Sequence, residues 1–376
     1  MPGLLPDVDP DGLLEYSVVY TDRALNHMSR AFQQVMRDIS ESLKAVYGAE
    51  SAVVVPGSGT FGMESVARQF ATGKKCLVLR NGWFSYRWSQ ILEMGGIPSE
   101  TIVMKARPVQ EGSQAPFAPA PIEEVLTTIA AEKPDVVFAP HVETSCGMIL
   151  PDDYLRAVAE AVHAVGGLFV LDCIASGAIW VDMRQIGVDV LISAPQKGWS
   201  GSPCCGLVML GANALSAMEG TTSTSFACDL GKWLDIMRAY ENGGHAYHAT
   251  MPTDGLRILA DVMREIEAFG YEKARERQKT LGRRVRDLLS GHGFVSVAAK
   301  GFQAPGVVVS YTADADMQSG RKFAEAGLQI AAGVPLQCDE PDDFQTFRLG
   351  LFGLDKLADV DRTVASLESA LNGVLG

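Results

Sequence analysis

Several features are missing from this sequence of 376 residues, and each absence excludes a class of protein. No window reaches the roughly 18 to 20 apolar residues that a membrane-spanning helix needs, so we expect no membrane partner. No run of Lys or Arg is long enough to neutralise a phosphate backbone, and the net charge is −13, so nucleic acid is not expected either. With 47% hydrophobic and 20% charged residues, the composition is that of an ordinary globular protein.

Cysteine spacing gives no sign of a disulfide framework or a zinc site. The seven cysteines are odd in number and none forms a CxxC pair, which favours a reducing compartment. The opening residues MPGLLPDVDPDG carry three acids and no base, so we expect neither a signal peptide nor a transit peptide, and a cytoplasmic location. His141, His245 and His248 lack partners at ligand spacing; we therefore expect loop or core histidines and no metal.

Short apolar runs alternate with helical stretches through the middle of the chain. This pattern is typical of a largely parallel sheet covered by helices on both faces, and it predicts an α/β fold. We expect strands at 52–56, 76–80, 135–140, 168–172, 188–193 and 206–210, and helices at 61–71, 84–95, 121–132 and 152–166.

The pattern changes after about residue 250. A long charged stretch at 271–288 predicts a connecting helix with a solvated face, which we favour over an anion-binding patch. Strands at 306–310 and 347–352 and a final helix at 355–372 indicate a smaller α+β unit. The expected organisation is an N-terminal arm (1–16), a large cofactor-binding domain (17–250) and a small C-terminal domain (251–376).

One lysine and one aspartate carry the chemical signal. Lys197 lies between an apolar run and a loop rich in Gly, Ser and Pro, and Asp172 ends the apolar strand LFVLD. A pyridoxal-phosphate enzyme needs this pair: the lysine forms a Schiff base, and the acid holds a proton on the pyridine nitrogen so that the ring accepts electrons. The alternatives are a surface lysine and an aspartate that caps a helix.

A glycine motif indicates phosphate binding. Gly57, Gly59 and Gly62 match GxGxxG between an expected strand and an expected helix, where backbone N–H groups can bind phosphate. The alternatives are a purely structural turn and dinucleotide binding, but a dinucleotide site expects this motif in the first strand–helix unit and an acid after the next strand. An expected helix at 26–48 comes first here, and the position after the next strand is Arg80, which could instead favour a 2′-phosphate.

Seven strings occur in the order found in one enzyme family: GSGT (57–60), NGWFSYRW (81–88), HVETSCG (141–147), DCIAS (172–176), SAPQKG (193–198), AYHATMP (246–252) and FRLGLFG (347–353). From about residue 50 onward the chain resembles the class V aminotransferases, most of all the alanine:glyoxylate and serine:pyruvate aminotransferases. The resemblance implies the type I pyridoxal-phosphate transferase fold, with a mostly parallel seven-stranded sheet between helices and a smaller C-terminal α+β domain. It also implies pyridoxal 5′-phosphate as cofactor and a homodimer with shared active sites.

The resemblance further implies roles for individual residues. Lys197 would form the Schiff base and move the proton, Asp172 would pair with the ring nitrogen, and Phe84 would stack on the ring, with Trp83 or Tyr86 as alternatives. The other implied site residues are Ser58, Gly59, Thr60 and Gln196 at the phosphate, Thr144 near the phenolic oxygen, Tyr247 and Thr250 at the neighbouring subunit's phosphate, and Arg348 on the substrate carboxylate.

The implied reaction moves an amino group from a small amino acid such as alanine or serine to glyoxylate or pyruvate, with sulfonate- or phosphonate-bearing amines left open. The segment at 15–27 lacks the GPG-type string common near the substrate in such enzymes. Cys338, ten residues before Arg348, opens the alternative of a cysteine desulfurase or another lyase. However, Phe84 and Gln196 stand where desulfurases usually carry histidines. A non-catalytic binding protein would lack the lysine, the acid or the arginine.

Overall fold

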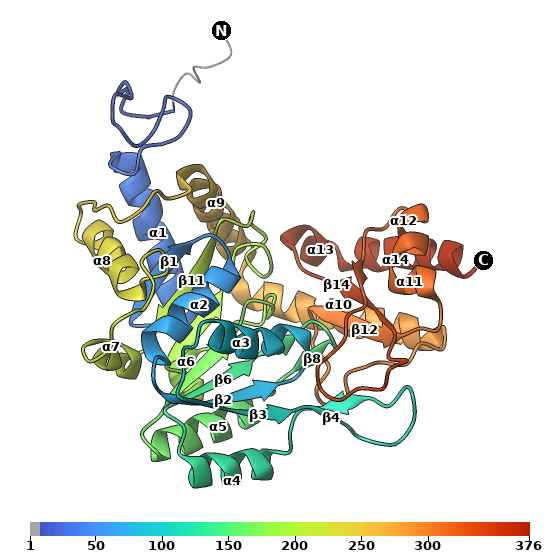
Figure 1. Ribbon diagram of the computed structural model, residues 1–376. Helices are drawn as coiled ribbons and strands as arrows, with labels where there is room; N and C mark the ends of the chain where they lie inside the picture. Colours follow the sequence, from blue (N-terminus) through green and yellow to red (C-terminus); the bar gives the residue numbers. More distant parts are fainter. Residues whose placement is uncertain (1–7) are drawn as a thin grey trace.

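The computed structural model describes residues 8–376; residues 1–7 of the predicted arm lie outside the described part. Within it, a seven-stranded sheet has the order β1-β11-β10-β9-β6-β2-β3 (Figure 1). Its strands are β1 (Ser51–Pro56), β2 (Lys75–Arg80), β3 (Glu100–Lys105), β6 (Val136–Pro140), β9 (Leu168–Asp172), β10 (Val190–Ser193) and β11 (Cys205–Leu210). Six of these strands run in one direction and β11 runs in the opposite direction, so the predicted mostly parallel α/β sheet is confirmed.

The degree of burial of each strand explains whether its residues predicted it. β6 and β11 are buried along their whole lengths, as expected for strands covered on both faces, and they read as continuous apolar runs. In the seven-stranded sheet, the strand that the residue pattern did not predict is β3. It lies at the sheet edge, begins with exposed residues and ends at Lys105. Charged residues are common on edge strands because they discourage pairing with other chains.

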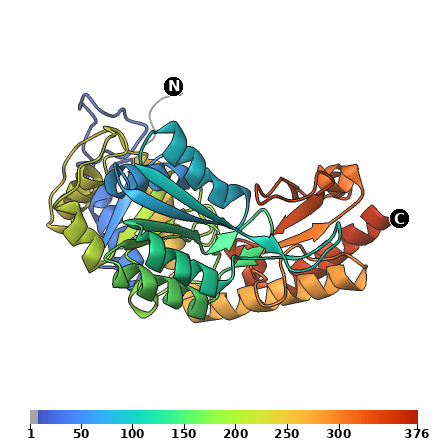
Figure 2. The ribbon, with the colours of Figure 1, turned by 60° about the horizontal axis from the view of Figure 1, so that its bottom comes forward.

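Helices cover both faces of the sheet. Figure 2 shows α2 and α3 on one face and α4 and α5 on the other. Beside the edge strand β1 pack α1 and α8, which are amphipathic helices with their apolar sides inward. The bounds of these helices are α1 (Arg30–Tyr47), α2 (Gly59–Phe70), α3 (Trp83–Met94), α4 (Ile122–Glu132), α5 (Asp152–Ala164) and α8 (Leu230–Glu241).

The glycine motif sits where α2 approaches the sheet closely. A Cβ atom at Gly59 would lie 2.6 Å from the Ile174 side chain, and one at Gly206 would lie 2.9 Å from the Gly62 Cα. The strand before the motif, β1, is at the sheet edge and pairs with the antiparallel β11, whereas in a dinucleotide fold it would pair with the next strand of the chain. The topology therefore does not fit the dinucleotide alternative.

Two long helices lead out of the large sheet. α9 (Thr253–Phe269) packs on α1, and after a break at Gly270 (φ 97°) α10 (Tyr271–Gly291) runs toward the C-terminal part (Figure 2). The division at residue 250 stays a prediction. Because α9 packs on the large part, we propose that the boundary lies nearer Gly270.

In the described chain, the C-terminal part is built on a three-stranded sheet of order β12-β14-β13. Its elements are β12 (Val307–Tyr311), β13 (Ala331–Ala332), β14 (Thr346–Gly350), α13 (Leu354–Ala358) and α14 (Val360–Leu375). The predicted final helix at 355–372 is thus two helices. Asp359 separates them, because its carboxylate accepts a hydrogen bond from the Arg362 N–H and caps α14.

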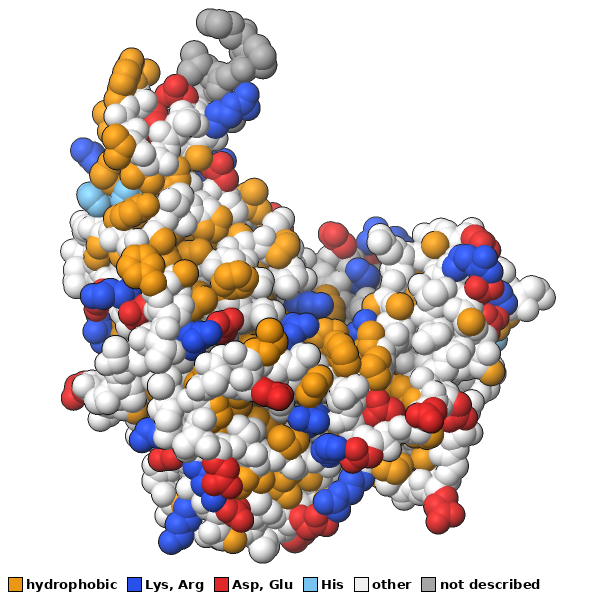
Figure 3. Space-filling model, in the orientation of Figure 1, with side chains coloured by type: hydrophobic (Ala, Val, Ile, Leu, Met, Phe, Trp, Pro, Cys, Tyr) orange, Lys and Arg blue, Asp and Glu red, His pale blue; other side chains and the backbone are white. Residues whose placement is uncertain are grey.

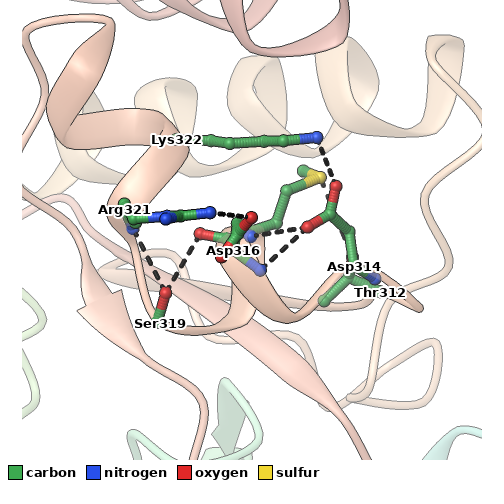
Figure 4. Close-up of polar contacts among 7 residues, drawn as sticks. Thr312, Asp314, Asp316, Ser319, Arg321 and Lys322 are labelled. Carbon is green, nitrogen blue, oxygen red and sulfur yellow. Dashed lines mark hydrogen bonds and ion pairs between the residues drawn. The ribbon is translucent and has the colours of Figure 1, made fainter.

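Ion pairs and caps shape the segment after β12, which contains α11 (Ala315–Gln318) and α12 (Arg321–Glu325) (Figure 4). Asp314 caps α11 through backbone N–H groups, among them that of Asp316 at 2.8 Å, and pairs with Lys322 on α12. These contacts link two short helices that also bury the side chains of Met317 and Phe323.

The remaining short elements are β4 (Arg107–Pro108), β5 (Phe117–Ala118), β7 (Val142–Glu143), β8 (Met148–Ile149), α6 (Met183–Ile186) and α7 (Ala212–Met218). No helix within residues 8–376 is long and apolar enough to cross a membrane. The cytoplasmic location stays a prediction. Figure 3 shows a hollow between the large part and the C-terminal part.

Candidate active site

The predicted site residues follow strands that end at the same edge of the large sheet. Asp172 is the last residue of β9, and Lys197 lies in the loop after β10. β1 and β6 run in the same direction as these two strands, and Ser58 and Thr144 follow them. Ligands of open α/β sheets bind at this carboxyl edge. Arg348 comes from β14 of the C-terminal sheet.

Asp172 is a buried carboxyl that forms no ion pair within the described chain. One of its oxygens accepts a hydrogen bond from the Ile174 N–H at 2.9 Å. Burial raises the pKa of Asp172 to about 7, the nearby Glu143 adds to this, and Arg87 acts in the opposite direction. A protonated ring nitrogen next to Asp172 would stabilise the charged form, so this carboxyl fits the pyridine end of the cofactor.

Lys197 is a partly buried amine. Its Nζ lies 5.1 Å from the centre of the Phe352 ring. Burial, and then the charge of Arg348, lower the pKa of Lys197, which increases the neutral fraction that can attack an aldehyde. The loop that carries it is tightly packed, since a Cβ atom at Gly198 would lie 2.1 Å from the Gly177 carbonyl oxygen.

The start of α2 has donors free for a phosphate. The Ser58 side chain does not cap α2, so the first N–H groups of this described helix have no side-chain partner there. The Thr60 hydroxyl accepts a hydrogen bond from Arg87 at 3.1 Å. The Oε1 of Gln196 is buried without a hydrogen-bond partner in the described chain. Gly59 packs against Ile174, which joins this end of α2 to the Asp172 segment.

Phe84 lies between two arginines. Its ring centre is 5.3 Å from the Cζ of Arg87 and 5.4 Å from the Cζ of Arg348. Trp83 and Tyr86 instead face each other with ring centres 5.8 Å apart. The structure therefore brings Phe84, of the three candidate aromatics, next to the predicted substrate arginine, while its stacking on the cofactor stays a prediction.

Arg348 is held in place by two carbonyl groups. Its Nε donates to the Ala332 oxygen at 2.7 Å, and its Nη1 approaches the Thr144 oxygen at 3.5 Å. Burial lowers the pKa of Arg348, opposed by the charge of Glu143, but an arginine stays protonated in proteins. The guanidinium is therefore a fixed cation near Lys197, suited to an anionic substrate group.

Tyr247 and Thr250 are not brought to the other site residues within this subunit. They lie on the segment between α8 and α9, where their hydroxyls are 3.1 Å apart. In the described chain neither side chain makes a hydrogen bond to any other predicted site residue, and Tyr247 is 54% exposed. Their predicted role at a neighbouring subunit's cofactor is compatible with this exposure.

Cys338 is not placed as a nucleophile. It is buried, with its sulfur 3.4 Å from the Arg80 carbonyl oxygen, and burial raises the pKa of Cys338 to about 12. A reactive cysteine needs an accessible thiolate. The residue on which the desulfurase alternative depended therefore lacks the required environment.

Arg80, the residue that could have bound a 2′-phosphate, is already engaged. Its guanidinium donates hydrogen bonds to the Gln337 carbonyl and the Ser89 hydroxyl, so it is not free for such a phosphate.

Several site residues were not identified from the sequence. All four of them, Arg87, Glu143, Ser145 and Phe352, stand in the seven strings. The contacts of Glu143 and Ser145 depend on how their segment meets α3. No spacing rule in the chain distinguishes them from ordinary polar loop residues.

Known proteins share both sequence and fold with this chain. The family model for class V aminotransferases matches residues 13–342. A 2-aminoethylphosphonate–pyruvate transaminase from Burkholderia ambifaria is 30% identical over 356 residues, which cover 92% of this chain and 89% of that protein. Two crystal structures share the fold. They are an alanine–glyoxylate aminotransferase from Nostoc sp. (TM-score 0.73, 22% identity, 93% and 89% of the two chains) and a pyridoxamine–pyruvate aminotransferase from Mesorhizobium loti (TM-score 0.78, 17% identity, 99% and 89%).

The match to the family model spans most of the chain, and Asp172 and Lys197, the two residues predicted to act on pyridoxal phosphate, lie at one edge of the sheet. The chain therefore belongs to the class V aminotransferases and is a pyridoxal-phosphate-dependent enzyme that transfers amino groups.

Proposed function

We propose that this enzyme transfers the amino group of a small anionic amine to pyruvate or glyoxylate. The observation that carries the proposal is the fixed guanidinium of Arg348, which lies close enough to Lys197 to lower the pKa of its amine. Such a cation can hold the carboxylate of alanine or serine. It can equally hold a phosphonate, and the Burkholderia relative is named for 2-aminoethylphosphonate and pyruvate.

The chain's own groups divide the remaining tasks. When bound, pyridoxal phosphate supplies the aldehyde and the electron-accepting ring. Asp172 keeps the ring nitrogen protonated, and the start of α2 with Gln196 holds the phosphate. The amine of Lys197, once free, carries the proton to and from the substrate carbon. Phe84 presents a flat apolar face beside the anion-binding Arg348.

We also propose a homodimer with shared sites. Tyr247 is exposed, and the N-terminal segment that stands out from the body carries further exposed apolar side chains (Figures 1 and 3). They are Leu13, Leu14, Tyr16 and Val18, with exposed fractions of 68%, 80%, 89% and 103%. Exposed apolar clusters of this kind mark interaction surfaces.

Mixing two inactive variants tests the shared site. A Lys197→Ala subunit paired with a Tyr247→Ala subunit has one site with both residues intact, provided that the tyrosine acts across the interface. Activity should then reappear when the two variants are mixed and refolded together. A mixed dimer, with one intact site of two, should reach at most half of the activity of a wild-type dimer. If each variant is inactive and the mixture is inactive too, the shared site is wrong.

The reaction itself is tested by a donor screen. Alanine, serine and 2-aminoethylphosphonate are each offered with pyruvate or glyoxylate, and the new amino acid is measured by chromatography. Alanine with pyruvate is left out, because that pair yields the same two compounds. Borohydride should fix the cofactor to Lys197 as a mass increase on its peptide, and Lys197→Ala should abolish both this label and turnover. Wild-type transfer by the lysine variant would refute the assignment.

A further inference from the structure

Glu143 is a buried carboxylate whose oxygens are saturated with hydrogen-bond donors. Its side chain is among the least exposed in the protein, at 1%. One oxygen accepts from the N–H groups of Phe84 (3.2 Å) and Ser145 (3.0 Å) and from the Ser145 hydroxyl (2.7 Å). The other accepts from the Ser85 N–H (2.8 Å) and hydroxyl (2.7 Å). A buried charge is tolerated when it is bonded in this way.

These bonds cap α3. Besides the two N–H groups bound by Glu143, the Trp83 N–H donates to the Ser145 hydroxyl at 3.0 Å. The first three N–H groups of the helix are thus bound by a loop from the sheet edge. Negative charge at a helix start also interacts favourably with the helix dipole.

The contact between this loop and α3 leaves no spare room. A Cβ atom at Gly82 would lie 2.0 Å from the Ser145 oxygen and 2.8 Å from the Glu143 Cγ. Only glycine allows the two segments to approach this closely. A side chain at position 82 would therefore force the two segments apart.

The same loop reaches Arg348. Thr144 lies between Glu143 and Ser145, and its carbonyl oxygen is 3.5 Å from the Arg348 Nη1. The Arg348 Cζ lies 5.4 Å from the centre of the Phe84 ring. One loop thus contacts the backbone of Phe84 on one side and the guanidinium of Arg348 on the other.

We propose that Glu143 is a positioning residue that fixes the aromatic face of Phe84 and the anion-binding Arg348 relative to each other. The proposal rests on the proposed function, since it takes Arg348 as the substrate's anion site. Glu143 touches neither substrate nor cofactor in this scheme. It acts through the two residues that do.

The test compares Glu143→Gln with Asp189→Asn. Glutamine keeps the shape but replaces one acceptor oxygen by a donor, which opposes the N–H groups of Phe84 or Ser85. Asp189 is an equally buried carboxylate (3% exposed) that accepts from the Phe169 N–H at 2.7 Å. It precedes β10 and so lies at the opposite edge of the sheet.

Two readouts separate positioning from general stability. One is the visible circular dichroism of the bound cofactor, which reports its orientation. The other is the Kd of propionate, a carboxylate without an amine, titrated against the cofactor's absorption, with Arg348→Ala as the reference for a lost anion site. Both variants should have a lowered Tm. Glu143→Gln alone should change the dichroism and weaken propionate binding by about tenfold or more.

The inference is overturned if Glu143→Gln lowers only Tm and binds propionate as the wild type does. Should that variant not fold, Ser145→Ala removes the acceptor of the Trp83 N–H and leaves the carboxylate in place. It should give the same two changes to a smaller extent, and unchanged values would overturn the inference. A wild-type protein without a cofactor absorption band would instead refute the proposed function.

Discussion

Replacing Asp172 by asparagine should stabilise the cofactor-free protein at neutral pH. The carboxyl is 8% exposed, and burial raises its pKa from the ordinary 3.8 to about 7. In the unfolded chain it loses its proton near pH 4, whereas in the folded protein it keeps the proton up to about pH 7. The folded state therefore binds more protons between these values, and stability falls as the pH rises through this window.

The size of the effect follows from the two pKa values. The difference between about 7 and 3.8 corresponds to about 4 kcal/mol, since each pKa unit is worth about 1.4 kcal/mol. Asparagine has the same shape and no charge, so the variant should not show this fall. Below about pH 4 the two proteins should differ little through this mechanism, and above about pH 7 the difference should be constant.

Chemical unfolding measures the difference directly. Cofactor-free wild type and Asp172→Asn are unfolded in urea between pH 4.5 and 8, with tryptophan fluorescence as the signal. The advantage of the variant in free energy of unfolding should grow with pH by up to about 4 kcal/mol. Added pyridoxal phosphate should stabilise the wild type more than the variant. A difference that does not change with pH would refute the reasoning.

Three further substitutions test the site. Gly82→Ala should destabilise the protein by about 1–3 kcal/mol in the same unfolding assay, because the new methyl group overlaps Ser145, while Gly291→Ala, with open space around it, should not. Cys338→Ala should leave amine transfer within about twofold of wild type, as measured by initial rates, because the buried thiol takes no part. Arg348→Lys should raise KM for the anionic substrate about tenfold or more with a smaller change in kcat, because the charge stays and the planar fork is lost. Unchanged KM would remove Arg348 from the substrate site.

The sequence predicted the elements whose burial is uniform. Continuous apolar runs marked six of the strands, and the place of Asp172 and Lys197 at strand ends put both at one edge of a parallel sheet. β3 was missed because its exposed residues interrupt the apolar pattern. The final helix was predicted as one because helical periodicity continues across Asp359, although that side chain begins a new helix there.

The candidate site was predicted less completely, for a physical reason. Arg348 was predicted from the resemblance of its motif. The proposed role of Glu143 instead depends on its contact with the start of α3, about 60 residues away in the chain. A carboxylate that caps a distant helix leaves no periodic signal. The same holds for Cys338, whose sulfur contacts the carbonyl oxygen of Arg80, a residue more than 250 positions earlier in the chain.

The placement of β11 between β10 and β1 bears on how the protein assembles. Ser51 pairs with Leu210, and in the described sheet β1 has β11 as its neighbour. The strand that leads into the predicted phosphate-binding turn can therefore pair only with a segment synthesised much later. Closing such a long loop is slow. On the ribosome, we therefore expect the predicted cofactor site to be completed only after residue 210 has emerged, and shorter nascent chains to expose an unpaired strand edge that chaperones can recognise.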